Sequence, residues 1–500
     1  MGISFVRDLK PFGELPLEPR YAGLSDPYHT TVSPTPLPQP RLVHFNHALA
    51  AEIGLDTGDQ ELIEILSGNR PWPAYAPVAS VYAGHQFGNW VSQLGDGRAL
   101  TIAEIRKPDG ARVELQLKGA GQTPYSRGSD GRAVLRSSIR EYLCSEAMHA
   151  LGIPTTRCLS LVASPEPVQR ETTETAAVVC RVAPSFVRFG QFEFFYHRGQ
   201  HAQLAPLADH VIAENFPHLI NQPDRYGRWL EEVIERTARM IAQWQTVGFC
   251  HGVMNTDNFS ILGLTLDYGP FGFMDSFRQH HVCNHSDYEG RYGYDSQPLI
   301  GQWNCSRLLQ ATLPLLSANE EEAADIVTGI YERYAPAYSR EAIRLWTAKL
   351  GLREVREGDT DLVSRLLTLL HRSKSDFTRT FRHLSRVRTH TDAPATGVRE
   401  EIADLQAFDA WIVQYRARLR AEQNTDDAAR AASMNRVNPK YVLRNHLAQA
   451  AIERAMNGDD TEVDALMRLL SRPYDERPEM GHYAAAPPDE LRHLEISCSS

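Results

Sequence analysis

Strand-like and helix-like segments lie in separate parts of this chain, and that separation is the strongest constraint on its fold. Short apolar runs bounded by turn sequences occur from about Val81 to Tyr196, which is typical of strands. From about Leu204 onward, apolar residues recur mainly at helical spacing. This order predicts an α+β fold with a mainly helical C-terminal body. Strands are expected at 87–94, 100–105, 113–118, 178–182, 192–196 and 259–262.

The first three of these strands should form an antiparallel meander. Gly95-Asp96-Gly97 and Pro108-Asp109-Gly110 separate them, and both are turn sequences because glycine takes positive φ and proline presets the turn. A helix should follow, with Ser129 or Asp130 as its cap and Gly152 after its end. Other helices are expected at 42–55, 320–350, 361–385, 401–422 and 439–470.

A bilobal protein kinase has this order of elements, although any other α+β fold with the same order is an alternative. The kinase interpretation divides the chain into four parts. These are an N-terminal extension at 1–75, an N-lobe with the three-stranded meander and helix at 76–200, a helical C-lobe at 201–471 with a metal loop at 251–275, and a tail at 472–500 that carries Cys498.

Composition excludes several classes of protein. The chain has 62 acidic and 52 basic side chains, a net charge of −10, which argues against a general nucleic-acid binder. Its apolar runs are far shorter than the roughly 18 residues that a membrane span needs. The seven cysteines are widely spaced without Cys-x-x-Cys, which fits neither a disulfide framework nor a zinc ribbon. We expect a soluble, cytoplasmic protein with mostly reduced thiols.

Lys118 ends the third expected strand, where a kinase places the lysine that pairs with phosphates. Glu141 and Glu146 on the following helix are candidate partners for it. An exposed lysine at a strand end is the alternative. The Gly95-Asp96-Gly97-Arg98 turn lies where a kinase has its phosphate-covering loop, and glycines there would let backbone N–H groups approach phosphate oxygens. A tight hairpin would need the same glycines.

A second cluster runs from His251 to Asn258 and continues at Leu266-Asp267-Tyr268-Gly269. Asn258 and Asp267 are nine residues apart, so a short hairpin could bring both oxygens onto one Mg²⁺. Val253 stands where a kinase-like His-Gly-Asp element has its catalytic aspartate, and valine cannot take a proton. Either Asp257 replaces that aspartate, or the chain is a silent nucleotide-binding scaffold.

Longer blocks closely resemble the selenoprotein O family. They are Tyr82-Ala83-Gly84-His85-Gln86-Phe87-Gly88, the stretches 117–127 and 131–141, Asn255-Thr256-Asp257-Asn258, and the terminal Cys498-Ser499-Ser500. The resemblance therefore covers essentially the whole chain. It implies a protein-kinase-like fold that binds ATP in a flipped orientation. It also implies transfer of AMP from ATP to protein Ser, Thr or Tyr hydroxyls, with UMP transfer from UTP also attributed to the family.

The resemblance also implies a role for each matching residue. Asp257 would be the proton acceptor and Glu141 the partner of Lys118. Asn258 and Asp267 would hold Mg²⁺, or Mn²⁺, since both ions accept oxygen ligands. The nucleotide contacts would be Gly95, Gly97, Arg98, Lys118, Asp130, Gly131, Arg181, Arg188 and Asp267.

The chemistry of AMP transfer is consistent with this set of residues. Attack at the α-phosphorus makes pyrophosphate the leaving group, so negative charge develops on the β and γ oxygens. Lys118, Arg181 and Arg188 could stabilise that charge, because guanidinium groups suit phosphate. Transfer of the γ-phosphoryl group is the enzyme alternative. Arg132, Arg136 and Arg140 share a helical spacing, for which we favour a solvated or acid-paired stripe.

Cys498 stands where some members of the family carry selenocysteine. The resemblance supports a disulfide between Cys498 and Cys283, which would pin the tail across the region after the metal loop. His280, His281 and His285 are close to Cys283 in sequence and would favour its thiolate when protonated. Two unrelated free thiols are the alternative.

Overall fold

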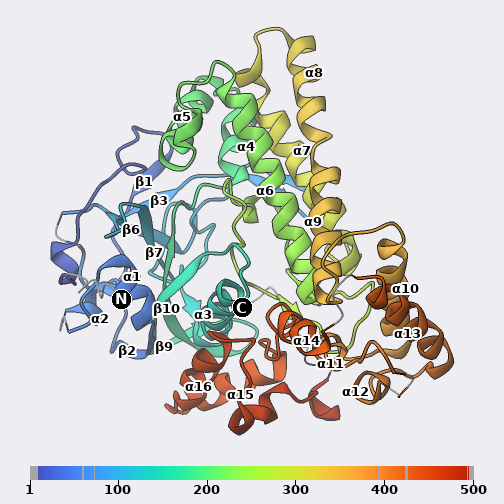
Figure 1. Ribbon diagram of the computed structural model, residues 1–500. Coiled ribbons are helices and arrows are strands. Elements are labelled where there is room, and N and C mark those ends of the chain that lie inside the picture. The colour runs from blue at the N-terminus through green and yellow to red at the C-terminus, as the bar shows by residue number, and fades with distance from the viewer. Residues whose placement is uncertain are drawn as a thin grey trace, which may run out of the picture.

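The computed structural model describes residues 9–58, 61–72, 74–391, 393, 395–422, 426–492 and 494. Over these residues the chain combines an antiparallel sheet with 16 α-helices, and its C-terminal part is mostly helical (Figure 1). The expected mixture of strands followed by helices is confirmed. No helix in these ranges is both long and apolar enough to cross a membrane.

The main sheet has the strand order β1-β3-β6-β7-β10-β9-β2, and β8 pairs with β10. Both edge strands, β1 and β2, come from the stretch expected to be an N-terminal extension, so this stretch completes the sheet. The strands are β1 (His29–Thr31), β2 (Arg41–Phe45), β3 (Val78–Ser80), β6 (Ala99–Arg106), β7 (Arg112–Lys118), β8 (Ala133–Val134), β9 (Arg157–Gln169) and β10 (Thr173–Ala183).

The helix expected at 42–55 is wrong in its first part. Residues 41–45 form β2, and α1 (His47–Ile53) begins only after Asn46, whose side chain accepts a hydrogen bond from the backbone N–H of Leu49. An asparagine cap of this kind satisfies one of the free N–H groups at a helix start. The short helix α2 (Leu62–Leu66) follows.

The expected three-stranded meander is also wrong. Strands β4 (Gly84–Gln86) and β5 (Asn89–Val91) form a hairpin of their own, while β6 pairs with β3 and β7. The segment around Asp96 is held against β3, because the Ser80 N–H donates to Asp96 Oδ2 at 3.0 Å and the Asp96 N–H donates to the Ser80 carbonyl at 2.9 Å. Of the two expected turns, only the one at 108–110 joins neighbouring strands of the sheet.

Successive residues of β10 supply two different cores. Val178, Cys180 and Val182 are buried with α1 and α2 on one face of the sheet. Ala177 and Val179 are buried on the other face with α3 (Leu135–Ala150). This follows from the two-residue repeat of a strand. The expected helix after the sheet is thus present, but its N-cap is Val134, so neither Ser129 nor Asp130 caps it.

The strand expected at 192–196 is a helix, α4 (Phe189–His197). Its aromatic run suggested a strand, but Phe189, Phe192, Phe194 and Phe195 are all buried on different sides of the helix. A helix that is apolar on all sides is stable only inside a core. The run at 259–262 is likewise no strand, because Phe259 and Ser260 make only isolated bridges.

The C-terminal helices form three groups (Figure 1). The longest helix, α6, packs against α7 and α9; α10 packs against α13 and α11 against α12; and α15 and α16 pack on α3. The helices expected at 320–350, 361–385 and 439–470 are each divided in two. Their bounds are α5 (Leu204–Asn215), α6 (Arg225–Val247), α7 (Gln297–Leu316), α8 (Glu320–Tyr331), α9 (Tyr334–Lys349), α10 (Asp359–Ser373), α11 (Phe377–Leu384), α12 (Thr396–Arg399), α13 (Leu405–Arg420), α14 (Asp427–Asn435), α15 (Asn445–Met456) and α16 (Thr461–Leu470).

Candidate active site

A cavity of 660 Å³ lies where the sheet meets the loop at 253–270. Its size is in the range usual for small-molecule sites. It contains most of the residues that the sequence marked for nucleotide and metal binding. The expected residues that line it are Gly95, Gly97, Arg98, Lys118, Arg181, Arg188, Asp257, Asn258 and Asp267.

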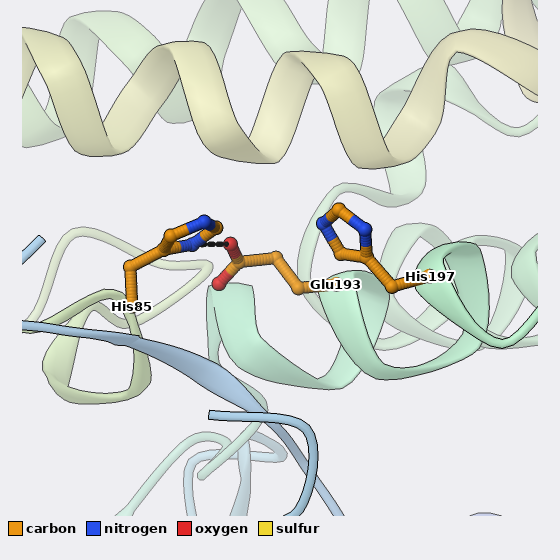
Figure 2. Close-up of side chains that lie close together, drawn as sticks. All are labelled: His85, Glu193 and His197. Atoms are coloured by element: carbon orange, nitrogen blue, oxygen red, sulfur yellow. Dashed lines mark hydrogen bonds and ion pairs between the residues drawn. The ribbon is translucent and has the colours of Figure 1, made fainter. Parts of the chain in front are cut away.

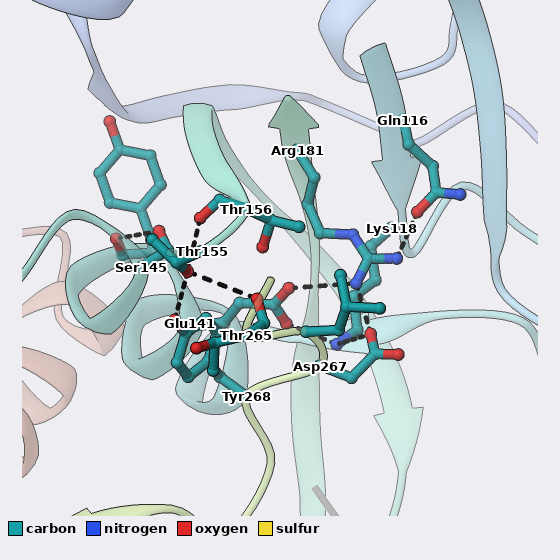
Figure 3. Close-up of polar contacts among 12 residues, drawn as sticks. Gln116, Lys118, Glu141, Ser145, Thr155, Thr156, Arg181, Thr265, Asp267 and Tyr268 are labelled. Atoms are coloured by element: carbon teal, nitrogen blue, oxygen red, sulfur yellow. Dashed lines mark hydrogen bonds and ion pairs between the residues drawn. The ribbon is translucent and has the colours of Figure 1, made fainter. Parts of the chain in front are cut away.

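Three cations converge on Asp267 in this cavity, and two of them, Lys118 and Arg181, are drawn in Figure 3. Arg188 Nη1 lies 2.5 Å from Asp267 Oδ2, Arg181 donates to Oδ1, and Lys118 Nζ lies 3.8 Å from Oδ1. Burial acts to raise the pKa of Asp267, but Arg188, Arg181 and Lys118 together hold it well below the usual value. Asp267 is therefore ionised across the neutral pH range.

Lys118 is oriented by the helix that follows the sheet. Its Nζ lies 2.5 Å from Glu141 Oε2, and Glu141 Oε1 lies 3.4 Å from Arg181 Nη1. The other candidate partner, Glu146, binds Arg157 at 2.7 Å instead. Burial lowers the pKa of Lys118, and Glu141 opposes that shift. The expected pairing of Lys118 with Glu141 is thus what the structure contains.

The two arginines are buried to an unusual degree for charged side chains. Arg181 and Arg188 are each only 2% exposed. Arg181 also donates to the side chain of Gln116, and Arg188 Nη1 donates to the Asp257 carbonyl at 2.9 Å. The Arg188 guanidinium lies 4.8 Å from the centre of the Tyr82 ring. Cations fixed in this way need little rearrangement to stabilise charge on a bound phosphate chain.

Asp257 lies in a 3₁₀ turn, Thr256–Asn258, at the wall of the cavity. Gln86 Nε2 donates to its Oδ2 at 3.3 Å, and Oδ1 has no hydrogen-bond partner within the described ranges. Burial raises the pKa of Asp257 to about 7, against the opposing effect of Arg188. Gly84 permits this packing, because a Cβ there would lie 2.8 Å from Asp257 Oδ1. A carboxyl group of this pKa can accept a proton near neutrality.

Asn258 and Asp267 both line the cavity and carry side-chain oxygen atoms. Asn258 Nδ2 donates to the Val253 carbonyl at 3.0 Å, so a cation would meet the amide oxygen. Each carboxylate oxygen of Asp267 has a second lone-pair site besides the one used by an arginine. Neutral and anionic oxygens of this kind suit Mg²⁺ or Mn²⁺. The donor set therefore fits the expected metal.

Two expected nucleotide contacts do not line the cavity. Asp130 lies behind Arg170, with which it forms a two-point ion pair at 2.7 and 3.0 Å, and Arg170 itself lines the cavity. Gly131 has a φ of 70°, and a Cβ there would lie 2.2 Å from the backbone of Gly121. The glycine is therefore required by backbone packing, whatever it contributes to binding.

The arginines of the expected stripe agree only in part with what the sequence favoured, because Arg132 and Arg136 are acid-paired whereas Arg140 is buried. Arg132 Nη2 lies 3.0 Å from Glu166, and Arg136 binds Glu174 at 2.9 Å. Arg140 donates to the Phe271 carbonyl at 2.6 Å. Only Arg136 and Arg140 lie on α3, because the helix starts at Leu135.

Several further residues of the cavity had no role in the sequence interpretation. Arg170 stands in the turn between β9 and β10, where no motif marks it. Asp96 is buried, binds Tyr82 at 3.3 Å, and has its pKa raised by burial. Tyr82 and Gln86 did carry a signal, since both lie in the family-like block at 82–88.

Cys283 is partly buried, and its Sγ lies 3.4 Å from the Cys250 carbonyl. Burial raises the pKa of its thiol well above the usual value, and burial lowers the pKa of His281 to about 4. Near neutral pH His281 is therefore uncharged and the Cys283 thiol protonated, so of the three histidines expected to favour the thiolate, His281 does so only under acidic conditions. Cys498 lies outside the described residues. Leu494, four residues before it, lines a cavity of 310 Å³ together with Arg140 and His285.

Comparisons with known proteins find relatives over nearly the whole chain. The family described as "Protein adenylyltransferase SelO" matches residues 11–471. A "Protein nucleotidyltransferase YdiU" of Methylococcus capsulatus is 68% identical over 489 residues, which are 97% of this chain and 97% of the relative. Proteins of the same name from Burkholderia vietnamiensis and Paraburkholderia xenovorans are 53% and 54% identical. They align over 97% of this chain and over 96% and 95% of their own lengths.

Proposed function

This chain belongs to the SelO family of protein nucleotidyltransferases, and on that premise we propose that it is a Mg²⁺- or Mn²⁺-dependent protein adenylyltransferase. It moves AMP from ATP, with UTP as a second donor, onto Ser, Thr or Tyr hydroxyls of other proteins. The hydroxyl oxygen bonds to the α-phosphorus, the bond from the α-phosphorus to the bridging oxygen breaks, and pyrophosphate leaves.

The observation that carries this proposal is the convergence of Lys118, Arg181 and Arg188 on one carboxylate inside a cavity of nucleotide size. Departure of pyrophosphate concentrates negative charge on the β and γ oxygens. Cations that are buried and already oriented stabilise such charge better than mobile surface cations. We assign the two arginines to these terminal phosphates.

Asp257 accepts the proton of the attacking hydroxyl. Its pKa of about 7 leaves a substantial ionised fraction at neutral pH while keeping it basic enough to take a proton. Val253, which also lines the cavity, cannot take this role. Gln86 fixes the orientation of Asp257 through its Oδ2, while Oδ1 is buried against Gly84.

Asn258 and Asp267 hold the metal through their side-chain oxygens. When bound, Mg²⁺ or Mn²⁺ neutralises charge on phosphate oxygens. Asp267 keeps its negative charge because the three nearby cations hold its pKa low. Asp267 therefore has two roles. It binds the metal, and its two carboxylate oxygens hold Arg181 and Arg188 in place.

We also propose a protein-kinase-like, bilobal arrangement, with the N-lobe at 76–200 and the C-lobe at 201–471. The position of the cavity supports it, since β6, β7 and β10 contribute one wall and the 253–270 loop the other. The pairing of a strand lysine with a helix glutamate, Lys118 with Glu141, is the arrangement that kinases use.

A Cys283–Cys498 disulfide is the proposed redox element. Cys498 is four residue steps beyond Leu494, a distance of at most about 14 Å for an extended chain. Leu494 shares a cavity with His285, two residues from Cys283, which supports the pairing. Formation of the bond releases two protons and passes two electrons to an oxidant such as a small disulfide. Because burial keeps Cys283 protonated, we expect Cys498 to supply the attacking thiolate.

Intact-mass spectrometry tests the proposed reaction. The enzyme is incubated with acceptor proteins, ATP and Mg²⁺, with Asp257→Asn as the matched control. A gain of about 329 Da indicates AMP and about 80 Da indicates phosphate. With UTP, a gain of about 306 Da indicates UMP. Phosphate transfer would contradict the proposal in favour of a γ-phosphotransferase. No gain on any acceptor, or on the enzyme itself, would favour a silent scaffold.

A further inference from the structure

A second group of ligand-type side chains lies beside the cavity, on α4 and the β4–β5 hairpin. Glu193 and His197 are four residues apart on one face of α4, and His85 faces them from β4 (Figure 2). One ligand atom from each of the three lies within 4.8 Å of the others. Segments distant in sequence thus bring two imidazoles and a carboxylate to one place.

Glu193 has a partner for only one of its oxygens. Its side chain is fully buried, and Oε1 lies 2.6 Å from His85 Nδ1. Oε2 has no hydrogen-bond partner within the described ranges. Leaving a buried charged oxygen without a partner is expensive, so such oxygens usually bind a donor or a metal. The residues next to Glu193 along α4, Phe192, Phe194 and Phe195, have no polar side-chain atoms.

His197 completes the group from the end of α4. His197 is exposed, and its ring centre lies 4.1 Å from that of Trp90, whose ring centre also lies 5.0 Å from that of His85. Trp303 approaches His85 edge-on at 5.3 Å. Burial lowers the pKa of His197, which favours the neutral imidazole that metals bind. The aromatic rings restrict how far either imidazole can turn.

We propose that His85, Glu193 and His197 bind a divalent transition-metal ion of the zinc class, at a site separate from Asn258 and Asp267. Two imidazoles and one carboxylate are a common zinc donor set, with a fourth position left to water. Mg²⁺ avoids imidazole, so the two sites select different metals. Tetrahedral zinc ligands lie roughly 3.4 Å apart, and the three ligand atoms here all lie within 4.8 Å of one another.

The site would anchor the strand that contacts the proposed proton acceptor. The backbone N–H of His85 donates to Thr256 Oγ1 at 2.7 Å, and the side chain of the next residue, Gln86, donates to Asp257. A metal joining β4 to α4 would therefore hold Gln86 in place. This consequence rests on the proposed role of Asp257, whereas metal binding itself does not.

The test is zinc binding by the full-length protein. The protein is dialysed against a chelator, reloaded with Zn²⁺ in excess Mg²⁺, desalted, and analysed for metal. We expect one Zn²⁺ per chain and an increase in the thermal midpoint on loading. His197→Ala should weaken the affinity at least about tenfold. Zinc that desalting removes from the unsubstituted protein would overturn the proposal.

Three variants make the outcome specific. Glu193→Gln keeps the side-chain shape and should lose zinc while the circular dichroism spectrum stays unchanged. His201→Ala removes a nearby histidine that stacks on Tyr196, and it should leave zinc affinity unchanged. Asp267→Ala should keep full zinc binding even if it ends transfer. Equal losses in His197→Ala and His201→Ala, or unchanged affinity in both His197→Ala and Glu193→Gln, would refute the site.

Discussion

Asp257→Asn should greatly slow transfer yet stabilise the folded protein above neutral pH. Burial raises the pKa of Asp257 from 3.8 to about 7, so the folded state prefers the protonated acid. Its contribution to the free energy of unfolding is therefore complete below about pH 4 and is lost as the pH rises through about 7. The full difference corresponds to about 4 kcal/mol, of which about 3 kcal/mol falls between about pH 5 and about pH 8. Asparagine has the same shape but does not ionise, so it escapes this loss.

Urea-induced unfolding of both proteins at about pH 5 and about pH 8, without nucleotide or metal, measures the effect. The free energy of unfolding of Asp257→Asn, minus that of the unsubstituted protein, should increase by about 3 kcal/mol from the lower to the higher pH. Gln86→Leu is a useful companion, because it removes the hydrogen bond to Oδ2 and should raise the pKa of Asp257 further. A stability difference that does not change with pH would refute the reasoning.

The same substitution separates catalysis from binding. Because Asp257 is assigned to the hydroxyl, turnover should fall by about 10²–10⁴ while the affinity for ATP changes little. The rate of the unsubstituted enzyme should rise with pH as Asp257 ionises around 7. A loss that lies mainly in nucleotide affinity would contradict the role of proton acceptor.

Further substitutions test the metal ligand, the cations assigned to the terminal phosphates and the proposed disulfide. Asp267→Ala should lower turnover at least about 10²-fold even at saturating metal, because a carboxylate ligand has no substitute; near-normal turnover would remove it from the metal site. Arg181→Gln and Arg188→Gln should each weaken ATP binding by about tenfold or more and AMP binding much less. Calorimetric titration with both nucleotides measures this. Equal losses for ATP and AMP would mean that the arginines do not contact the terminal phosphates. Cys498→Ser should remove the 283–498 disulfide from peptide maps of oxidised protein and abolish any response of activity to reductant. An unchanged response would exclude this disulfide as a redox element.

Local patterns were sufficient for the parts of the site that are built from neighbours in sequence. The turn at 108–110 identified the β6–β7 hairpin, and that hairpin places Lys118 at the end of a strand. The helical spacing after Val134 identified α3, which carries Glu141 to Lys118. These elements follow from turn chemistry and apolar period, which act within a few residues.

Other features of the site depend on contacts that the sequence does not display. The run at 192–196 has the composition of a strand, and only its burial on all sides makes it the helix α4 that carries Glu193. Arg170 reaches the cavity because of where the β9–β10 turn lies, and Asp130 is separated from the cavity by that arginine.

The residue types expected for nucleotide transfer could thus be identified from the sequence, because motif spacing and family-like blocks are local. The tertiary structure decided their properties. Burial sets the pKa of Asp257, three cations from different strands and loops set that of Asp267, and two elements distant in sequence bring His85 to Glu193. Desolvation and charge pairing depend on distances in space, so only the folded chain determines them.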